Sequence, residues 1–181
     1  MDPGLIALIM GTIPESGANY QTNNFCAVEH GGTHIDAPLH FYRGAWAVHD
    51  IPVDRMIGDA VVVDVTAKVF GHVDYQATEL DLRVWEEKHG RIPVGSILFL
   101  FTGWGRYWPD RKKFLGTESR HTTLFEKNIV GIDNVANLDQ LPPTGAMVIG
   151  LPMKIRGGSG APLRIIGLFN SLQNYAGIIR G

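Results

Sequence analysis

The stretch Ala60-Val-Val-Val-Asp-Val-Thr66 is short, rich in β-branched residues and apolar at nearly every position, which is typical of a β-strand. Three other runs have the same character and turn residues beside them: 96–102, 146–151 and 164–169. Because these runs are apolar almost continuously, we expect the strands to be buried on both faces.

One helix is predicted downstream of the first strand, over residues 79–89. Thr78 is suited to cap its first turn, and Gly90 is suited to end it. Its charged residues are expected to form a solvated outer face. Three apolar residues at helical spacing are expected to pack on the sheet: Leu80, Val84 and Trp85. The strands and this helix together predict an α/β fold, with a mixed β-sheet flanked by a few helices.

The composition predicts one soluble domain over residues 1–181. The chain is 45% hydrophobic and 19% charged, so it can bury a core, and its length leaves little room for a second domain. A net charge of -2 argues against nucleic acid or an anionic membrane surface as a partner. The apolar run 5–10 is too short to span a bilayer and lacks the basic residues of a signal peptide. A single cysteine excludes a disulfide framework, so we expect a cytoplasmic location.

The residues with metal-binding chemistry are concentrated in the segment His30-Gly-Gly-Thr-His34-Ile-Asp36-Ala-Pro-Leu-His40. Imidazole nitrogen and carboxylate oxygen are ligands of zinc and similar divalent ions. All four residues of these types have even numbers, so they would project from one face of an extended segment. His34 and Asp36 could bind one ion directly, whereas His30 needs the two glycines to bend the backbone. Separate polar residues on a solvated strand are the alternative interpretation.

Pro38 has no amide hydrogen, so we expect it to end strand pairing and to turn the chain. This turn would carry His40 toward the metal site. We therefore expect His40 to act as an acid/base group rather than as a metal ligand.

This segment resembles the motif H-x-G-T-H-x-D-x-P-x-H of the cyclase family of metal-dependent hydrolases, which includes bacterial-type kynurenine formamidase (arylformamidase) and isatin hydrolase. All seven specified positions are present, which makes the motif far more specific than a lone glycine-rich loop. The likeness extends to the runs 102–105, 137–142 and 151–160. The resemblance implies a cyclase-family fold of the swivelling β/α/β type. It also implies three metal ligands and one catalytic acid/base: His30, His34 and Asp36, and His40, respectively.

The resemblance also implies a second metal position. The formamidase branch has a downstream His and, twelve residues later, a Glu at this position, and this chain has His121 and Asp133 there. Asp is an oxygen ligand like Glu, but its side chain is one methylene shorter. The metal is expected to be Zn²⁺ or Mn²⁺, because His/Asp sites accept both. A homo-oligomer, either a dimer or a tetramer, is implied as well.

Compared with the family, this chain is shorter in two places. Relatives have a longer stretch between the positions of Trp108 and His121, and an additional strand with an aromatic pocket residue before the position of Met1. The single domain is therefore expected to lack an N-terminal segment and a segment before His121. The alternative to an enzyme is a non-catalytic truncated isoform or paralogue that acts as a subunit of a longer oligomer.

The family resemblance implies a small aromatic amide as the substrate. N-formylkynurenine would be hydrolysed to kynurenine and formate in tryptophan catabolism, the kynurenine pathway, and the lactam isatin is the alternative substrate. A divalent ion would lower the pKa of a water molecule, and His40 would carry a proton to the departing nitrogen. Trp104 and Tyr107 could line the substrate pocket, with packing inside the protein as the equal alternative.

The remaining reactive side chains do not indicate a second site. The sequence contains no G-x-S-x-G nucleophile elbow. Cys26 could be a thiol nucleophile, but a small buried hydrophobe is the more common role. The run Gly157-Gly-Ser-Gly160 lacks the context of a phosphate-binding loop and is expected to be a turn. His49, His72 and His89 have no partner at ligand spacing and are expected at the surface or in loops.

Overall fold

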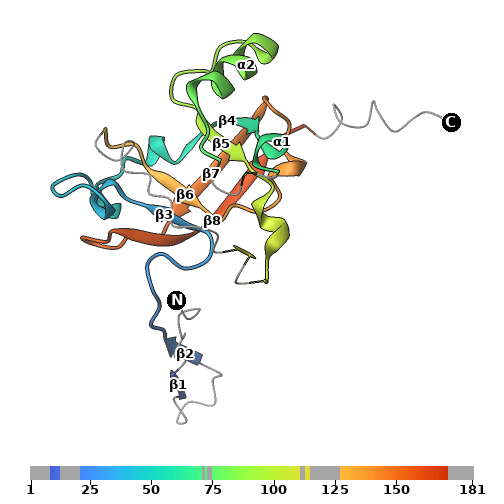
Figure 1. Ribbon diagram of the computed structural model, residues 1–181. Coiled ribbons are helices and arrows are strands. Elements are labelled where there is room, and N and C mark those ends of the chain that lie inside the picture. The colour runs from blue at the N-terminus through green and yellow to red at the C-terminus, as the bar shows by residue number, and fades with distance from the viewer. Residues whose placement is uncertain are drawn as a thin grey trace.

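A mixed β-sheet is the largest element of the structure. The computed structural model describes residues 9–12, 21–70, 72, 75–110, 113–114 and 127–170. In this part, six strands form one sheet in the order β5-β4-β7-β8-β3-β6 (Figure 1). Their bounds are β3 His34–Asp36, β4 Ile57–Asp64, β5 Ile97–Phe101, β6 Gly131–Asp133, β7 Ala146–Pro152 and β8 Gly160–Leu168. β4 and β5 are parallel and the other neighbouring pairs are antiparallel, which confirms the predicted mixed sheet.

The helices around this sheet are short. α1 spans Thr66–Val69, and α2 spans Glu79–His89 and packs on β4 (Figure 1). Short 3-10 helices occur at Pro38–His40, Val48–Asp50, Val53–Arg55, Trp104–Tyr107 and Leu138–Gln140. A hairpin of β1 Ile9–Thr12 and β2 Gln21–Asn24 lies apart from the sheet in Figure 1 and is not among the predicted elements. Among the described residues, no helix has the length and apolarity to cross a membrane.

Buried apolar residues form three clusters. One lies between β3, β8 and the turns that follow β3, a second lies against β4, β5 and β7, and a third lies beneath α2. Side chains along a strand point alternately to opposite faces. Ala60 and Val62 of β4 therefore enter the second cluster, and Val61 and Val63 enter the third. The prediction that this strand is buried on both faces is confirmed.

For β7 and β8 the same prediction is wrong. Four of their apolar side chains are 40–48% exposed: Met147, Leu151, Ile166 and Leu168. These residues lie on the face of the sheet that α2 covers at β4, but α2 does not extend over the β7–β8 pair in Figure 1. An apolar run shows that a strand is suited to burial, whereas actual burial depends on what packs against it.

The predicted bounds of α2 are confirmed, as is the packing of Trp85, but the predicted packing of Leu80 and Val84 is wrong. Leu80 and Val84 are exposed, whereas Asp81 and Trp85 are buried. Residues four apart lie on the same helix face, so burial of Asp81 and Trp85 turns their neighbours outward. The indole N–H of Trp85 donates a hydrogen bond of 2.8 Å to the Val62 carbonyl, which fixes this face against β4.

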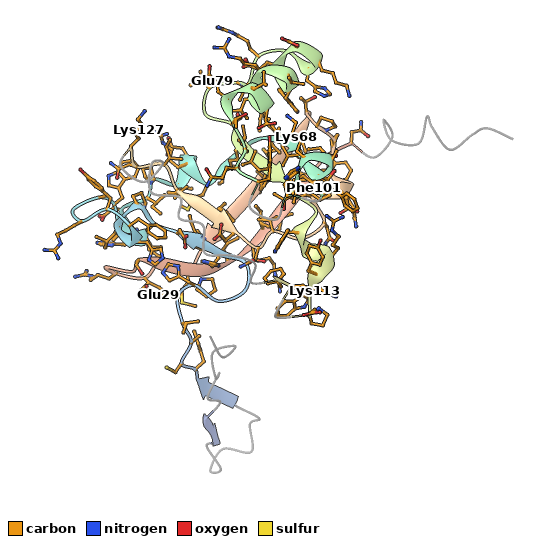
Figure 2. All side chains as sticks on the ribbon, in the orientation of Figure 1. Glu29, Lys68, Glu79, Phe101, Lys113 and Lys127 are labelled. Atoms are coloured by element: carbon orange, nitrogen blue, oxygen red, sulfur yellow. The ribbon has the colours of Figure 1, made fainter. Side chains whose placement is uncertain are left out.

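Asp81 is buried as a charged group at the start of α2. Its carboxylate accepts hydrogen bonds from the Thr78 backbone N–H (2.6 Å) and the Tyr75 hydroxyl (2.8 Å). It also forms an ion pair with Lys68, which is labelled below α2 in Figure 2. The hydrogen bonds from Lys68 and from the Thr78 backbone hold the pKa of Asp81 well below its ordinary value. These partners explain why a carboxylate expected on the solvated face lies toward the sheet.

Candidate metal and active site

β3 places two of the predicted ligand residues on one face of the sheet. The strand pairs with β6 on one side and with β8 on the other, which fixes its backbone along both edges. Because side chains alternate, His34 and Asp36 share a face, and Ile35 is buried in the core on the opposite face. A 3-10 helix begins at Pro38, which confirms that the strand ends before this residue.

A turn through Gly31 and Gly32 brings His30 back to Asp36. Gly32 has a φ of 65°, in the left-handed region that favours glycine. The turn leaves the His30 Nδ1 atom 2.7 Å from the Asp36 Oδ1 atom. The predicted glycine bend is confirmed. The extended conformation covers only residues 34–36, so His30 and His40 reach the site through turns.

The hydrogen bonds of His34 determine which of its nitrogens faces Asp36. His34 Nδ1 lies 2.9 Å from the Gly32 carbonyl oxygen, and a carbonyl oxygen only accepts hydrogen bonds, so Nδ1 carries a hydrogen. In the neutral ring, Nε2 then carries none. This Nε2 atom lies 3.1 Å from Asp36 Oδ1, so His34 and His30 converge on the same carboxylate oxygen.

His40 lies next to His30 at the exposed side of the site. The two rings are stacked, with their centroids 3.9 Å apart. Among the described residues, two groups of side chains have ligand atoms within 4.8 Å of one another, and both include Asp36. The first group is His30, Asp36 and His40, and the second is His34, Asp36 and Asp133. The structure therefore places His40 close enough to be either a ligand or a neighbouring acid/base.

Charge and burial act in opposite directions on Asp36 and His34. Burial alone would raise the pKa of Asp36, but hydrogen bonds from His34 and His30 outweigh burial and lower this pKa. Burial alone would lower the pKa of His34, but hydrogen bonds to Asp36 and to the Gly32 carbonyl, together with nearby negative charge, raise it. Without a metal, the pair therefore favours a negative carboxylate beside a protonated imidazole.

His40 shows the opposite behaviour to His34. Partial burial lowers the pKa of His40, and the charge of the neighbouring His30 lowers it further. The attraction of Asp36 for a positive ring is too weak to reverse this direction. A neutral His40 can accept a proton near neutral pH.

The donor set at Asp36 fits a divalent cation. The side chains of Asp36 and His34 are only 10% and 7% exposed, so the carboxylate is largely removed from water. An imidazole nitrogen without hydrogen repels a carboxylate oxygen at about 3 Å unless a proton or a cation lies between them. Neutral imidazole together with carboxylate is the ligand chemistry of zinc and of several other divalent ions.

Comparison with known proteins identifies the family. A family model described as "Putative cyclase" matches residues 5–138, which is more than half of the chain. The chain belongs to the cyclase family. An isatin hydrolase of Roseibium aggregatum is 27% identical over 188 aligned positions, which cover 77% of this chain and 72% of the relative. A kynurenine formamidase of Salinibacter ruber is 28% identical, with 76% and 74% of the two chains covered.

A solved structure supports the same conclusion for the fold. Isatin hydrolase A from Ralstonia solanacearum superposes with a TM-score of 0.77 and 29% sequence identity, covering 92% of this chain and 82% of that one. The predicted α/β fold and the predicted membership of a hydrolase family are both confirmed.

For this cyclase-family chain, only one of the two residues predicted for a second metal position can be placed. Asp133 lies on β6 directly opposite His34 of β3, and it belongs to the second ligand group. His121 lies outside the described residues. The shorter side chain of Asp133 is compatible with a position near His34, since β-sheet pairing holds the two backbones together.

Trp104 and Tyr107 lie beyond β5, at the other end of the strand order from β3 and β6. Trp104 packs against the cluster beneath α2, and its indole N–H donates a hydrogen bond of 2.8 Å to the Phe114 carbonyl. The Tyr107 ring contacts Trp104 edge-on at 4.8 Å. These contacts correspond to the packing interpretation, and a role in substrate binding stays a prediction.

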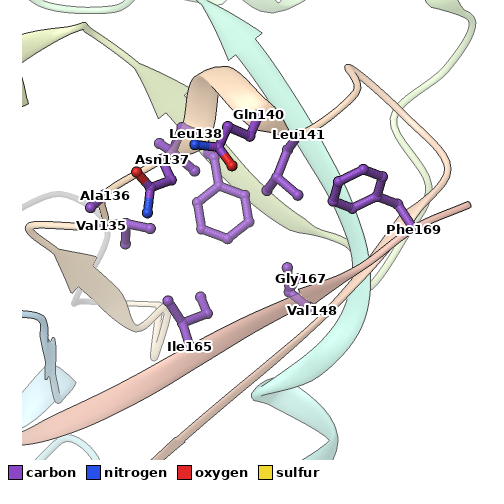
Figure 3. A pocket seen from close by; sticks show the side chains of 11 residues that line it. Val135, Ala136, Asn137, Leu138, Gln140, Leu141, Val148, Ile165, Gly167 and Phe169 are labelled. Atoms are coloured by element: carbon purple, nitrogen blue, oxygen red, sulfur yellow. The ribbon is translucent and has the colours of Figure 1, made fainter. Parts of the chain in front are cut away.

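The cavity drawn in Figure 3 lies on the opposite face of the sheet from His34 and Asp36. It has a volume of about 200 Å³, and its wall includes Ile165 and Gly167 of β8. Asp36 is paired with Gly160, so even-numbered residues of β8 share the face of the metal site and odd-numbered residues point away. The cavity is therefore separate from the histidine cluster.

Two residues near the site were not singled out from the sequence, Glu29 and Ser159. Glu29 precedes His30, on the segment that leads into β3 (Figure 2), and both Glu29 and Ser159 hydrogen-bond within the site. His49, expected at the surface or in a loop, accepts a hydrogen bond from the Gly157 backbone N–H at 3.1 Å. The glycine-rich run at 157–160, which contains Ser159, was the only feature of the sequence that pointed to this turn.

Cys26 is exposed, so the expectation of a buried hydrophobe is wrong.

Proposed function

We propose that this cyclase-family chain hydrolyses the C–N amide bond of a small aromatic amide, with a divalent ion held by His30, His34 and Asp36. One observation carries the proposal. His30 Nδ1 and His34 Nε2 converge on one oxygen of the largely buried Asp36, at 2.7 and 3.1 Å. Asp133, beside His34, is the candidate for a second position together with His121.

The chemistry divides between the ion and the side chains. When bound, a divalent ion lowers the pKa of water and polarises a carbonyl group. His40 stacks on His30 at the exposed side of the site, and its lowered pKa keeps it neutral near pH 7. His40 therefore accepts the proton of the attacking water and delivers it to the departing nitrogen, a role typically worth about 10²–10⁴-fold in rate.

The primary substrate we propose is N-formylkynurenine, which is hydrolysed to kynurenine and formate. Similarity to several kynurenine formamidases supports this choice. Isatin is the second candidate, favoured by the likeness to solved isatin hydrolase A at a TM-score of 0.77. In both compounds the amide nitrogen is attached to an aromatic ring, so one arrangement of ion and proton carrier serves either reaction.

The function is tested with protein stripped of metal by a chelator and then reloaded with Zn²⁺ or with Mn²⁺. Each preparation is assayed with N-formylkynurenine and with isatin, and its metal content is measured. We expect the reloaded protein to hydrolyse one of the two substrates, and the metal-free protein to hydrolyse neither. Bound metal without turnover of either substrate would support the non-catalytic subunit instead. Absence of bound metal would overturn the proposed site.

The finer properties are part of the same proposal. Zn²⁺ or Mn²⁺ is the expected ion, since both bind imidazole and carboxylate together. A homo-oligomer, either a dimer or a tetramer, is proposed from the family resemblance, and a cytoplasmic location is proposed from the single cysteine. Light scattering of the purified protein measures its oligomeric state.

A further inference from the structure

The turn between β7 and β8 faces the metal site directly. Ser159 in this turn places its hydroxyl oxygen 2.9 Å from His30 Nε2. The turn itself is fixed by backbone hydrogen bonds from Ala37 to the Ser159 carbonyl (2.9 Å) and from Val48 to the Gly158 carbonyl (3.0 Å). Ser159 is therefore held against His30 by the same segment that follows β3.

Glu29 holds the turn from the other side. One oxygen of its carboxylate, Oε2, accepts hydrogen bonds from the Ser159 backbone N–H (3.0 Å), the Ser159 hydroxyl (2.7 Å) and the Gly160 backbone N–H (3.3 Å). An oxygen that receives three donors at these distances has no room for a hydrogen of its own, so Oε2 is an acceptor in all three contacts. An ionised Glu29 acts only as an acceptor.

Two glycines allow this close approach. A Cβ atom on Gly158 would lie 3.0 Å from Glu29 Oε1. A Cβ atom on Gly160 would overlap the His30 ring, at 2.7 Å from Nδ1, and would also crowd the Ile35 carbonyl. The glycine-rich run at 157–160 thus has a steric role, because larger residues would push the turn away from Glu29 and His30.

The contacts around Ser159 determine which ring nitrogen of His30 carries a hydrogen. The Ser159 hydroxyl has one hydrogen, and the carboxylate of Glu29 can only accept it. Ser159 Oγ can then only accept from His30, so Nε2 of His30 carries a hydrogen. Nδ1 of His30 lies 2.7 Å from Asp36 Oδ1, which can only accept, so without metal a proton lies between these two atoms. A divalent ion that replaced this proton would meet Nδ1.

We propose that Glu29 and Ser159 are positioning residues that hold His30 with its hydrogen on Nε2 and so present Nδ1 to the divalent ion. The inference rests on the proposed function for the presence of the ion. Histidine ligands commonly donate their second N–H to a fixed acceptor, and loss of that acceptor typically weakens metal binding by about 10–100-fold. Here the acceptor is a serine whose own hydrogen is directed by a carboxylate.

The first measurement is made on the wild-type protein loaded with zinc, in which the ion replaces the proton next to Asp36. Nitrogen-15 NMR distinguishes a ring nitrogen that carries hydrogen from one that does not, and a His30→Ala spectrum identifies the signals of His30. We expect the hydrogen on Nε2. Hydrogen on Nδ1 overturns the proposal, and this result does not depend on turnover or on the folding of a Ser159 or Glu29 variant.

The second measurement is zinc affinity, by competition with a chromogenic chelator. Ser159→Ala should bind zinc about 10–100-fold more weakly than wild type. Glu29→Gln should also weaken zinc binding, but by less, because an amide oxygen can still accept a hydrogen bond from the serine hydroxyl. The matched control is Glu79→Gln, which removes a carboxylate from the exposed surface of α2 and should leave the zinc affinity unchanged.

Unchanged affinity in Ser159→Ala overturns the proposal, and unchanged affinity in Glu29→Gln overturns the part assigned to Glu29. If wild-type protein binds no zinc, the proposed function fails and this inference fails with it, whereas zinc binding by wild type with unchanged affinity in Ser159→Ala overturns this inference alone.

Discussion

At the scale of single residues, Asp36 is the group on which the site depends. One of its oxygens contacts both His30 and His34, and only 10% of its side chain is exposed. A buried carboxylate is costly unless positive charge or hydrogen-bond donors surround it. A proton on the histidines meets this need without metal, and a divalent ion meets it more completely because it also binds the imidazole nitrogens.

His40 is the residue whose role a single substitution can decide. We expect His40→Ala to lower kcat by about 10²–10⁴-fold and to leave the metal content unchanged, because the proton carrier is removed and the ligands remain. Rate assays and elemental analysis on the same samples measure both quantities. Loss of metal together with activity would show that His40 is a ligand, as its place beside His30 and Asp36 also allows. His72→Ala, at an exposed position, is the control.

The same residue sets the expected acid limb of the pH profile. His40 must be neutral to accept a proton, and its pKa lies below the ordinary value of 6.5. The value of kcat/KM should therefore rise with pH on this limb, with the midpoint of the rise below pH 6.5. A rise centred above pH 6.5 would contradict a free neutral His40 as the acceptor.

At the scale of elements, local signals predicted α2 well and its orientation poorly. Thr78 and Gly90 mark the two ends by local backbone chemistry, which does not require knowledge of the rest of the chain. The buried face depends on Tyr75 and Lys68, which meet Asp81 only after folding. β3 shows a related limit, since the segment 30–40 was considered as extended, whereas only residues 34–36 form a strand.

Asp81→Asn should lower the free energy of unfolding by about 1–3 kcal/mol at pH 7, because hydrogen bonds to a charged group are lost at a buried position. The folded-state pKa of Asp81 is depressed, so its stabilisation is present above the unfolded-state pKa of about 4 and is lost as pH falls below it. The difference from wild type should therefore narrow below pH 4. Denaturant unfolding at several pH values measures this.

Asp59→Asn is the matched control for this variant, because Asp59 is exposed on β4. It should change the unfolding free energy by less than about 0.5 kcal/mol. A difference between wild type and Asp81→Asn that stayed constant down to pH 2 would show that the carboxylate charge is not the source of the stability.

At the scale of the whole molecule, the site is assembled from segments far apart in the sequence. Asp36 pairs with Gly160 on one side and with Gly131 on the other. The motif at residues 30–40 made the four candidate residues recognisable, because their spacing lies within one short segment. The contributions of Glu29 and Ser159 depend on strand order, which a single sequence does not reveal.

Zinc should therefore stabilise the whole fold and not only one segment, since its proposed ligands lie on and beside a strand paired along both edges. A ligand at 100 times its Kd that binds only the folded state adds about 2.7 kcal/mol, which corresponds to a rise in Tm of about 5–10 °C for a chain of this size. Calorimetry with and without zinc measures the shift. Asp36→Asn should abolish it, and an equal shift in that variant would place the bound zinc elsewhere.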